Sequence, residues 1–194
     1  MLLLAAVFAH GAPRHKVETP VAPTGGNLAE IAAARDALRQ ATTALGEDHP
    51  VTAFMLRNLA LAMQEGGYSN HANHYAQQSL AILERHFGPV DVSLVPALNV
   101  LAEAAVSQAR YAEAREFAMR AVAIGPGAEA HYGTALHNLG ALLQAEGRFQ
   151  DAAEWYRKAL AVREKELPVG HPYIRVTRTA LERVQRSAQV MAHR

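Results

Sequence analysis

The sequence has no cysteine, few aromatic residues and almost no net charge, and each deficit excludes a class of explanation. Without cysteine the chain forms no disulfide, no thiolate zinc site and no cysteine nucleophile. This does not fix the compartment, because cysteine-free proteins occur on both sides of a bacterial inner membrane. With 19 basic and 18 acidic residues the net charge is +1, which gives no general attraction to nucleic acid or to an anionic membrane. We therefore expect no nucleic-acid partner.

The sequence also lacks the alternating runs of Val, Ile and aromatic residues from which a β-sheet is built. Half of the residues are apolar, and alanine dominates this fraction because aromatic residues make up only 6% of the chain. Alanine is the best helix former and lets helices approach each other closely. A charged fraction of only 19% is typical of a folded chain rather than a disordered one. These features predict an all-α domain.

The chain starts with an uncharged apolar run, "MLLLAAVFA" over residues 1–9. This run is too short to span a bilayer as a helix, which takes roughly 20 residues. It suits the central region of a signal peptide cut after Ala9, yet no Lys or Arg precedes it. An apolar tail or a misplaced start codon are the alternatives. Export would place the protein in the periplasm or outside the cell, and otherwise it is cytoplasmic. Residues 10–26, with three prolines and three glycines, indicate a flexible tether.

Three segments of the remaining chain align with one another without an internal gap. They read "NLALAMQEGGYSNHANHYAQQSLAI" from Asn58, "VLAEAAVSQARYAEAREFAMRAVAI" from Val100 and "NLGALLQAEGRFQDAAEWYRKALAV" from Asn138, at intervals of 42 and then 38 residues. In each segment a leucine is followed at once by Ala or Gly. The other columns that coincide are Gly67, Ala109 and Gly147; Ala72, Ala114 and Ala152; and Ser79, Ala121 and Ala159.

This repeated pattern predicts an antiparallel pair of helices. The small residue after the leucine lies where the two helices cross, since a larger side chain would hold the backbones apart. Gly67 and Gly147 are expected to end the first helix in the left-handed conformation that glycine adopts without a steric penalty. Tyr111 and Phe149 are expected to open the second helix and to pack back onto the first.

The same register extends in both directions and predicts eight helices. Gly25 aligns with Gly147, so a lone second helix precedes the first full pair, and Leu181 aligns with Leu59, so a lone first helix follows the last. A terminal helix of this kind shields the last apolar face of a repeat array. The expected helices span residues 27–45, 50–65, 69–86, 92–108, 111–124, 129–145, 149–166 and 172–190.

The stretch "NLGALLQAEGRFQDAAEWYRKAL" resembles a tetratricopeptide repeat, and the 42-residue interval with "LGEDHP" before it resembles the longer kinesin-light-chain type. The resemblance covers about residues 27–190 and implies a right-handed α-solenoid of antiparallel helix pairs. It divides this domain into a half repeat over 27–45, repeats over about 50–87, 91–125 and 129–167, and a capping helix over 172–190. Ser69, Val100 and Ala109 depart from the pattern and are expected to soften the packing locally.

Two His-Pro dipeptides occur at the same phase of the repeat. His49-Pro50 and His171-Pro172 precede predicted helices, and Asp91 stands at the equivalent place in the middle repeat. Because aspartate is a good N-cap and proline suits the first helical position, we interpret these residues as helix start signals rather than as catalytic histidines.

Neither metal binding nor catalysis has a convincing motif here. His71 and His74 lie three residues apart on a predicted helix, but no third ligand stands at helical spacing beside them, so a solvated polar face is the better interpretation. The chain has no Gly-x-Ser-x-Gly elbow, no phosphate-binding glycine loop and no His-Glu-x-x-His motif. We predict a non-enzymatic protein without catalytic residues, metal or cofactor.

The resemblance implies instead a concave groove, lined by the first helices of successive pairs, that binds a peptide or protein segment. The candidates mix charges and sizes, so they do not resemble the array of cations that clamps a C-terminal carboxylate. Carried over position by position, they are Arg57, Leu61, Gln64, Asn99, Glu103, Val106, His137, Ala141, Gln144, Arg183 and Arg186.

The predicted function is therefore a scaffold for protein–protein interaction, with two alternatives. The end helices, rich in Ala, Leu and Val, suit self-association into a homo-oligomer. The resemblance also allows a regulatory fragment of a larger enzyme or an operon-encoded complex. The last helix is basic, which suits either steering of an acidic partner or, more commonly, a solubilising cap. Its basic residues are Arg175, Arg178, Arg183, Arg186 and Arg194, against Glu182 alone.

Overall fold

The computed structural model describes residues 28–125, 127 and 130–192, and within them the chain forms eight α-helices, the short 3₁₀ helix η2 and no strand. The predicted signal peptide and tether, Gly25 and Arg194 lie outside the described residues. The helices are α1 (Leu28–Leu45), α2 (Pro50–Glu65), α3 (Ser69–Phe87), η2 (Val92–Leu94), α4 (Val95–Ser107), α5 (Tyr111–Ile124), α6 (Ala130–Ala145), α7 (Phe149–Glu166) and α8 (Pro172–Ala192).

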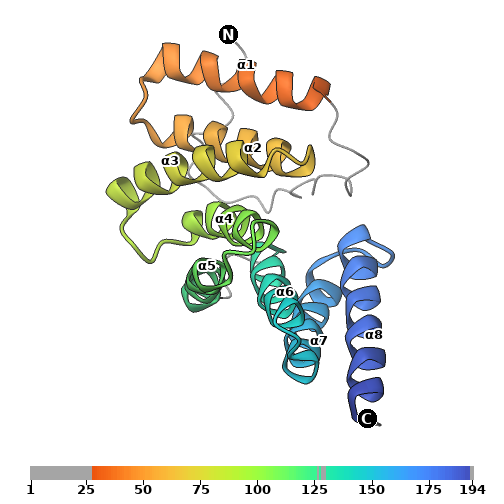
Figure 1. Cartoon of the computed structure of the whole chain (residues 1–194). Helices are drawn as coiled ribbons and strands as arrows, with labels where there is room; N and C mark the ends of the chain where they lie inside the picture. The colour runs from red at the N-terminus through yellow and green to blue at the C-terminus, as the bar shows by residue number, and fades with distance from the viewer. Residues whose placement is uncertain (1–27, 126, 128–129, 193–194) are drawn as a thin grey trace.

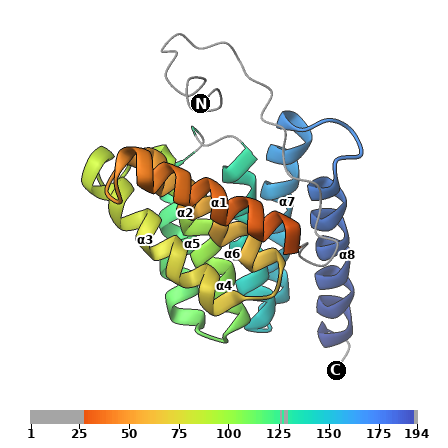
Figure 2. The same cartoon turned by 90° about the horizontal axis from the view of Figure 1, so that it is seen from above.

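The helices form a solenoid in which each one packs against its neighbours in the chain. The pairs are α2 with α3, α4 with α5, and α6 with α7, and they stack through contacts of α3 with α4, α5 with α6 and α4 with α6. The lone helices α1 and α8 cover the two ends, α1 on α2 and α8 mainly on α7. The stack curves so that α1 and α8 end on different sides of the molecule (Figures 1 and 2). This arrangement confirms the predicted helical solenoid.

The residue at each crossing point of a helix pair is small and fully enclosed, as predicted. Ala60, Ala102 and Gly140 have almost no exposed surface. A Cβ atom on Gly140 would lie 2.8 Å from ring carbons of Tyr156 on the partner helix α7, which is closer than atoms in contact approach. Where α7 has Tyr156, α3 has Ala76 and α5 has Ala118 at the same phase of the repeat. The pairs thus reach similar packing with two combinations, glycine with tyrosine and alanine with alanine.

The first helix of each pair ends in the left-handed conformation. Gly67 has φ 80° and Gly147 has φ 76°, which confirms the prediction for both glycines. Ala109, at the equivalent position after α4, has φ 56° and is the only non-glycine residue with positive φ among the described residues. The turn therefore keeps the same left-handed geometry without glycine, and the cost is backbone strain at Ala109.

The three predicted N-caps are confirmed. His49 Nδ1 accepts a hydrogen bond from the Val51 N–H at 3.1 Å, and His171 Nδ1 accepts one from the Tyr173 N–H at 3.2 Å. In the middle repeat Asp91 Oδ1 accepts from the Ser93 N–H at 2.9 Å. An imidazole and a carboxylate thus perform the same capping role at successive pairs.

The start of α4 differs from the prediction of one helix from residue 92. Residues Val92–Leu94 form the 3₁₀ helix η2, and the α-helix begins at Val95. Val95 donates its N–H to the Val92 carbonyl three residues back, and Pro96 has no N–H with which to make the α-helical bond to that carbonyl. The first turn therefore tightens before the α-helix continues.

Candidate binding groove

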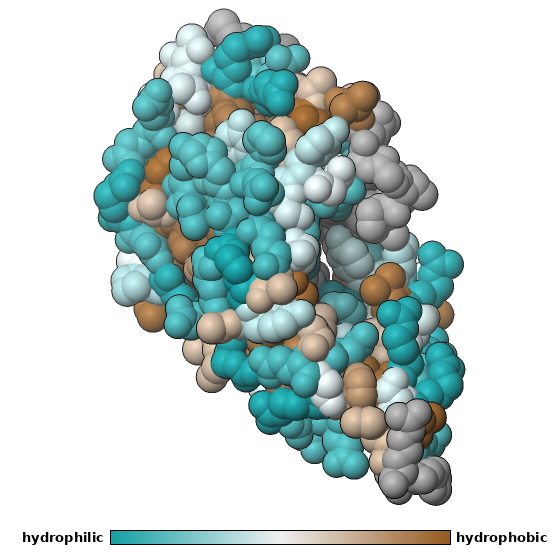
Figure 3. Space-filling model, in the orientation of Figure 1, coloured by the Kyte–Doolittle hydropathy of each residue, from teal (hydrophilic) through white to brown (hydrophobic). Residues whose placement is uncertain are grey.

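A hollow of about 560 Å³ lies between α6 and α8, with α7 beneath it. From α6 it is lined by His137, Ala141 and Gln144, which follow one another at helical spacing, and from α7 by Tyr156. In the space-filling view a recess separates α8 from the N-terminal helices (Figure 3). The side that α8 presents to the hollow comprises Pro172, Arg175, Val176, Thr179, Ala180 and Arg183.

His137 forms part of the wall and is held by neighbouring side chains. Its Nδ1 lies 3.3 Å from Thr177 Oγ1 on α8, and its ring centroid lies 5.0 Å from that of Tyr156. Burial, together with the positive charge of Arg163, lowers the pKa of His137 from 6.5 to about 3. The imidazole is therefore neutral at physiological pH, and it adds no charge to the hollow.

Tyr156 forms the floor and is only 2% exposed. Its hydroxyl donates a hydrogen bond to Gln144 Oε1 at 3.0 Å, which satisfies the one polar atom of this ring. Burial raises the pKa of Tyr156 to about 12, so the phenol stays protonated. The floor is thus largely apolar and fixed in position.

Arg175 and Arg183 project from α8 at the rim of the hollow, and both are exposed. Among the described residues neither has a carboxylate within 4.0 Å, whereas Arg178 on the same helix pairs with Glu164 at 2.7 Å. Between the two rim arginines lie Val176, Thr179 and Ala180. The hollow therefore combines an apolar interior with two unpaired cations.

One residue near the groove, Arg163 of α7, is not among those predicted from the sequence. Its side chain is 3% exposed and donates to the Tyr173 carbonyl at 3.1 Å, to Thr134 Oγ1 at 3.2 Å and to Thr177 Oγ1. Burial lowers its pKa to about 10, so it remains charged at neutral pH. Leu83 stands at this phase of the first repeat. A charged residue at a repeat position where the first repeat has a leucine was therefore the signal that could have identified Arg163.

Residues of α2, α4 and α8 act on one another electrostatically. The pKa of Tyr173 is raised by burial and by the charges of Glu65 and Glu103. The pKa of Glu103 is itself raised by burial, against the opposing effects of a hydrogen bond from Asn138 and the charge of Arg163. The ionisable groups of these three helices and of α7 therefore lie close enough to shift one another's pKa values.

The structure brings four of the predicted groove residues together around the hollow: His137, Ala141, Gln144 and Arg183. Asn99 does not offer a free side chain, because it is 4% exposed and its amide donates to the His131 carbonyl at 2.9 Å. Arg57 is half-buried, lies over the Phe54 ring at 5.4 Å and donates to Asn58 Oδ1 at 2.9 Å. Of the rest, Arg186 is exposed outside the hollow, and the half-buried ones are Leu61, Gln64, Glu103 and Val106.

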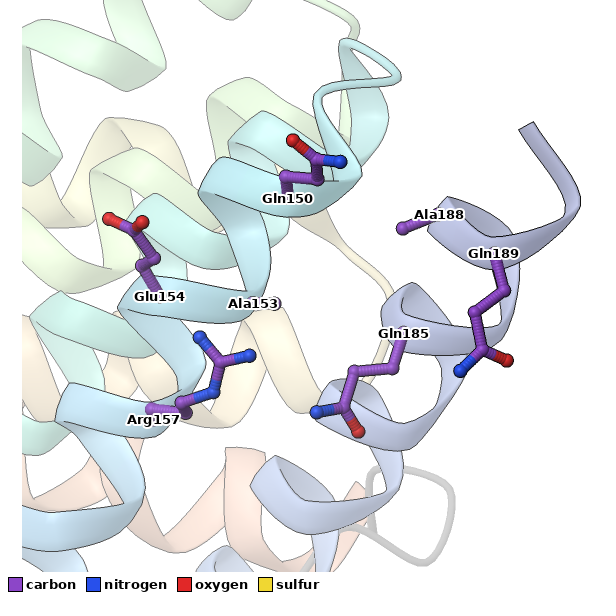
Figure 4. A pocket seen from close by; sticks show the side chains of 7 residues that line it. All are labelled: Gln150, Ala153, Glu154, Arg157, Gln185, Ala188 and Gln189. Carbon is purple, nitrogen blue, oxygen red and sulfur yellow. The ribbon is translucent and has the colours of Figure 1, made fainter. Parts of the chain in front are cut away.

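A second hollow of about 530 Å³ lies between α7 and α8 on the far side of α8. Arg157 and Gln185 point into it from the two helices (Figure 4). Five of its seven lining residues are polar or charged, and the lining consists of Gln150, Ala153, Glu154, Arg157, Gln185, Ala188 and Gln189. It offers little apolar surface for another helix to cover.

The part of the chain that the structure describes contains no group of three His, Asp or Glu side chains able to hold a metal ion. His74 Nε2 lies 3.3 Å from the Gln78 amide nitrogen, and His71 lies edge-on to Tyr68 with ring centroids 6.3 Å apart. Within the same residues, no helix has the length and apolar character needed to cross a bilayer.

Comparison with known proteins agrees with this architecture. The model of the tetratricopeptide repeat matches residues 93–165 and 131–189, which together span half of the chain. A search of curated proteins found no match.

Among solved structures 31 chains match. One holds nearly identical TPR-like repeats of a kinesin-light-chain protein from Podosopora anserina, with 22% identity over 84% of this chain and 79% of that one and a TM-score of 0.60. Another is BtubC (BKLC) from P. vanneervenii, with 20% identity over 81% of this chain and 65% of that one and a TM-score of 0.66. At such identities these structures show the fold alone. The family model, which matches half of the chain, shows that the chain belongs to the tetratricopeptide repeat family.

Proposed function

We propose that this chain is a non-enzymatic scaffold that binds a peptide or protein segment in the concave groove, with the hollow between α6 and α8 as its main contact. Tetratricopeptide repeat proteins bind protein partners. The observation that carries the proposal is the composition of this hollow, with a fixed apolar floor around Tyr156 and unpaired cations at the rim. A concave, largely apolar surface with a few polar groups is the usual form of a binding site.

The hydrogen bonds of the hollow favour binding over catalysis. The neutral His137 is engaged with Thr177, and the Tyr156 hydroxyl is engaged with Gln144. A general base needs a nucleophile within hydrogen-bond reach and a pKa near the working pH. With a pKa of about 3, His137 is too weak a base for this role.

Selection from a random dodecapeptide library displayed on phage tests the proposal. The wild type is compared with Ala141→Arg, which places a long side chain at a half-buried position in the α6 wall of the hollow, and with Ala161→Arg, which changes an exposed alanine of α7. We expect wild type and Ala161→Arg to select the same peptides and Ala141→Arg to lose them, while all three proteins retain the same helical circular dichroism. Equal selection by a folded Ala141→Arg variant would contradict the assignment of the groove.

A further inference from the structure

We propose that the hollow between α6 and α8 selects a segment with acidic side chains, which Arg175 and Arg183 bind at the rim while a small apolar residue rests on the floor between them. This inference rests on the proposed function and specifies the chemistry of its ligand.

The two rim arginines are available to a ligand. On the same helix Arg178 pairs with Glu164 at 2.7 Å, so its charge already has a partner within the protein. Arg175 and Arg183 have no carboxylate within 4.0 Å among the described residues, and both line the hollow. Their charges are therefore not neutralised by the protein itself.

The surroundings of the hollow favour an anion over a cation. His137 is neutral, so it neither adds to nor opposes the rim charges. The charged group beneath the wall is the guanidinium of Arg163, which donates to Thr177, and the carboxylate that acts on it is Glu103 of α4. A carboxylate bound at the rim would form charge-assisted hydrogen bonds with the two guanidinium groups, and these are stronger than hydrogen bonds between neutral groups.

The spacing of the rim arginines predicts a spacing in the ligand. Arg175 and Arg183 are separated by two turns of α8, about 12 Å along its axis. An extended segment advances about 3.3 Å per residue, so side chains four positions apart lie at about the same separation and on the same face. The residue midway between them would face Val176, Thr179 and Ala180, which present two methyl-bearing side chains and one alanine to a small apolar group.

The peptide selection described above, repeated with charge variants, tests this inference. The double variant Arg175→Gln/Arg183→Gln removes both rim charges, and Arg178→Gln removes an exposed charge of the same helix that faces Glu164. Peptides selected by wild type and by Arg178→Gln should be enriched in Asp and Glu at two positions four apart. The double variant should lose this enrichment, although it should still melt as the wild type does, because both changed residues are exposed.

Fluorescence anisotropy with one selected peptide gives the quantitative form of the test. Replacing one Glu of the labelled peptide by Gln should weaken binding to the wild type about tenfold, as expected for a charge-assisted hydrogen bond. The same replacement should have less than about a twofold effect on the double variant, because the paired cation is already gone. High salt should weaken the wild-type complex and leave that of the double variant nearly unchanged.

The experiments distinguish failure of the groove assignment from failure of the acidic preference. If the folded wild type selects no peptides, the groove assignment is overturned and this inference with it. If it selects peptides without acidic residues, or if the Glu-to-Gln change costs the same in wild type and double variant, the groove assignment stands and the acidic preference is overturned.

Discussion

Ala109 has the most strained backbone conformation among the described residues outside glycine. Its φ of 56° places a Cβ atom close to the neighbouring carbonyl, and this costs roughly 1 kcal/mol in an alanine. The strain persists because the turn between α4 and α5 is held by hydrogen bonds from the Ala109 and Arg110 N–H groups to the Val106 and Ala105 carbonyls. The turn geometry of the repeat therefore outweighs the preference of this single residue.

The change Ala109→Gly should raise the free energy of unfolding by about 0.5–1 kcal/mol, because glycine adopts this φ without the steric cost. Urea denaturation followed by circular dichroism measures the difference. The control Ala112→Gly, at an exposed position in the first turn of α5, should lower the stability by about 0.5 kcal/mol through loss of helix propensity. Equal destabilisation by both changes would contradict the strain at Ala109.

At the scale of the elements, the two helices of a pair are matched in size at their crossing. Gly140 of α6 leaves room for the Tyr156 ring of α7, whereas Ala60 of α2 faces a helix that has Ala76 at the same phase. Interiors of proteins are packed as closely as organic crystals, so neither residue of such a combination changes without effect on the other. The pair, rather than the helix, is the unit within which side-chain volumes are balanced.

The combination of Gly140 and Tyr156 predicts non-additive effects of mutation. Gly140→Ala should cost about 1–3 kcal/mol through overpacking, and Tyr156→Ala should cost about 3–5 kcal/mol through the cavity it leaves. The double variant restores the alanine pairing of the first two repeats, so its cost should be smaller than the combined cost of the single changes by about 1 kcal/mol or more. Chemical denaturation of the four proteins measures this coupling, and strictly additive costs would contradict the direct contact.

Most helix ends were predictable from the sequence because they depend on local features. His49, Asp91 and His171 cap helices through hydrogen bonds to residues two positions away, and Gly67 and Gly147 set the turn at their own backbone. The 3₁₀ start of α4 was not predicted. It depends on the hydrogen bond from the Val95 N–H to the Val92 carbonyl, next to Pro96, which has no N–H to donate. A repeat alignment carries no information on that choice.

The groove was predictable in outline, while several of its residues were not. Counting along first helices identified His137, Ala141, Gln144 and Arg183. It could not reveal that the Asn99 amide is engaged in a hydrogen bond to the His131 carbonyl, because this contact joins residues far apart in the chain. Arg163 comes from a second helix and was therefore outside the search. Arg175 lies two turns before Arg183, the first α8 position that was carried over.

At the scale of the whole molecule, the core is divided along the stack. One buried cluster runs from Ile31 of α1 to Ala135 of α6, and a separate one joins α6, α7 and α8 around Tyr156 and Val184. Repeat proteins derive their stability from such contacts between neighbours. A change in the second cluster therefore acts on the same helices that form the hollow, and binding and stability are coupled there.

The protonation of His137 makes the stability of this region depend on pH. The unfolded imidazole takes up a proton near pH 6.5, while the folded one has a pKa of about 3, so acidification between these values favours the unfolded chain. From pH 7 to pH 5.5 this histidine should account for a loss of about 1 kcal/mol.

The measurement compares urea denaturation at the two pH values in wild type, in His137→Gln and in His71→Gln, which removes an exposed histidine of α3. His137→Gln should show a smaller loss on acidification than wild type, whatever its own stability at pH 7. His71→Gln should behave as wild type does. The same pH dependence in all three proteins would show that His137 titrates normally in the folded state.

The glycine–tyrosine contact also bears on how genes of this kind diversify. Duplication of the segment encoding α6 and α7 together copies a cavity and the ring that fills it, so the new repeat is self-sufficient. Recombination between the helices of different repeats separates them. Joining α6 to α3 would leave Gly140 facing Ala76 across a void, and joining α2 to α7 would press the Tyr156 ring against the Ala60 methyl group. Viable crossovers should therefore fall in the loops between pairs, at residues 88–91 or 125–129, and not in the turns within them.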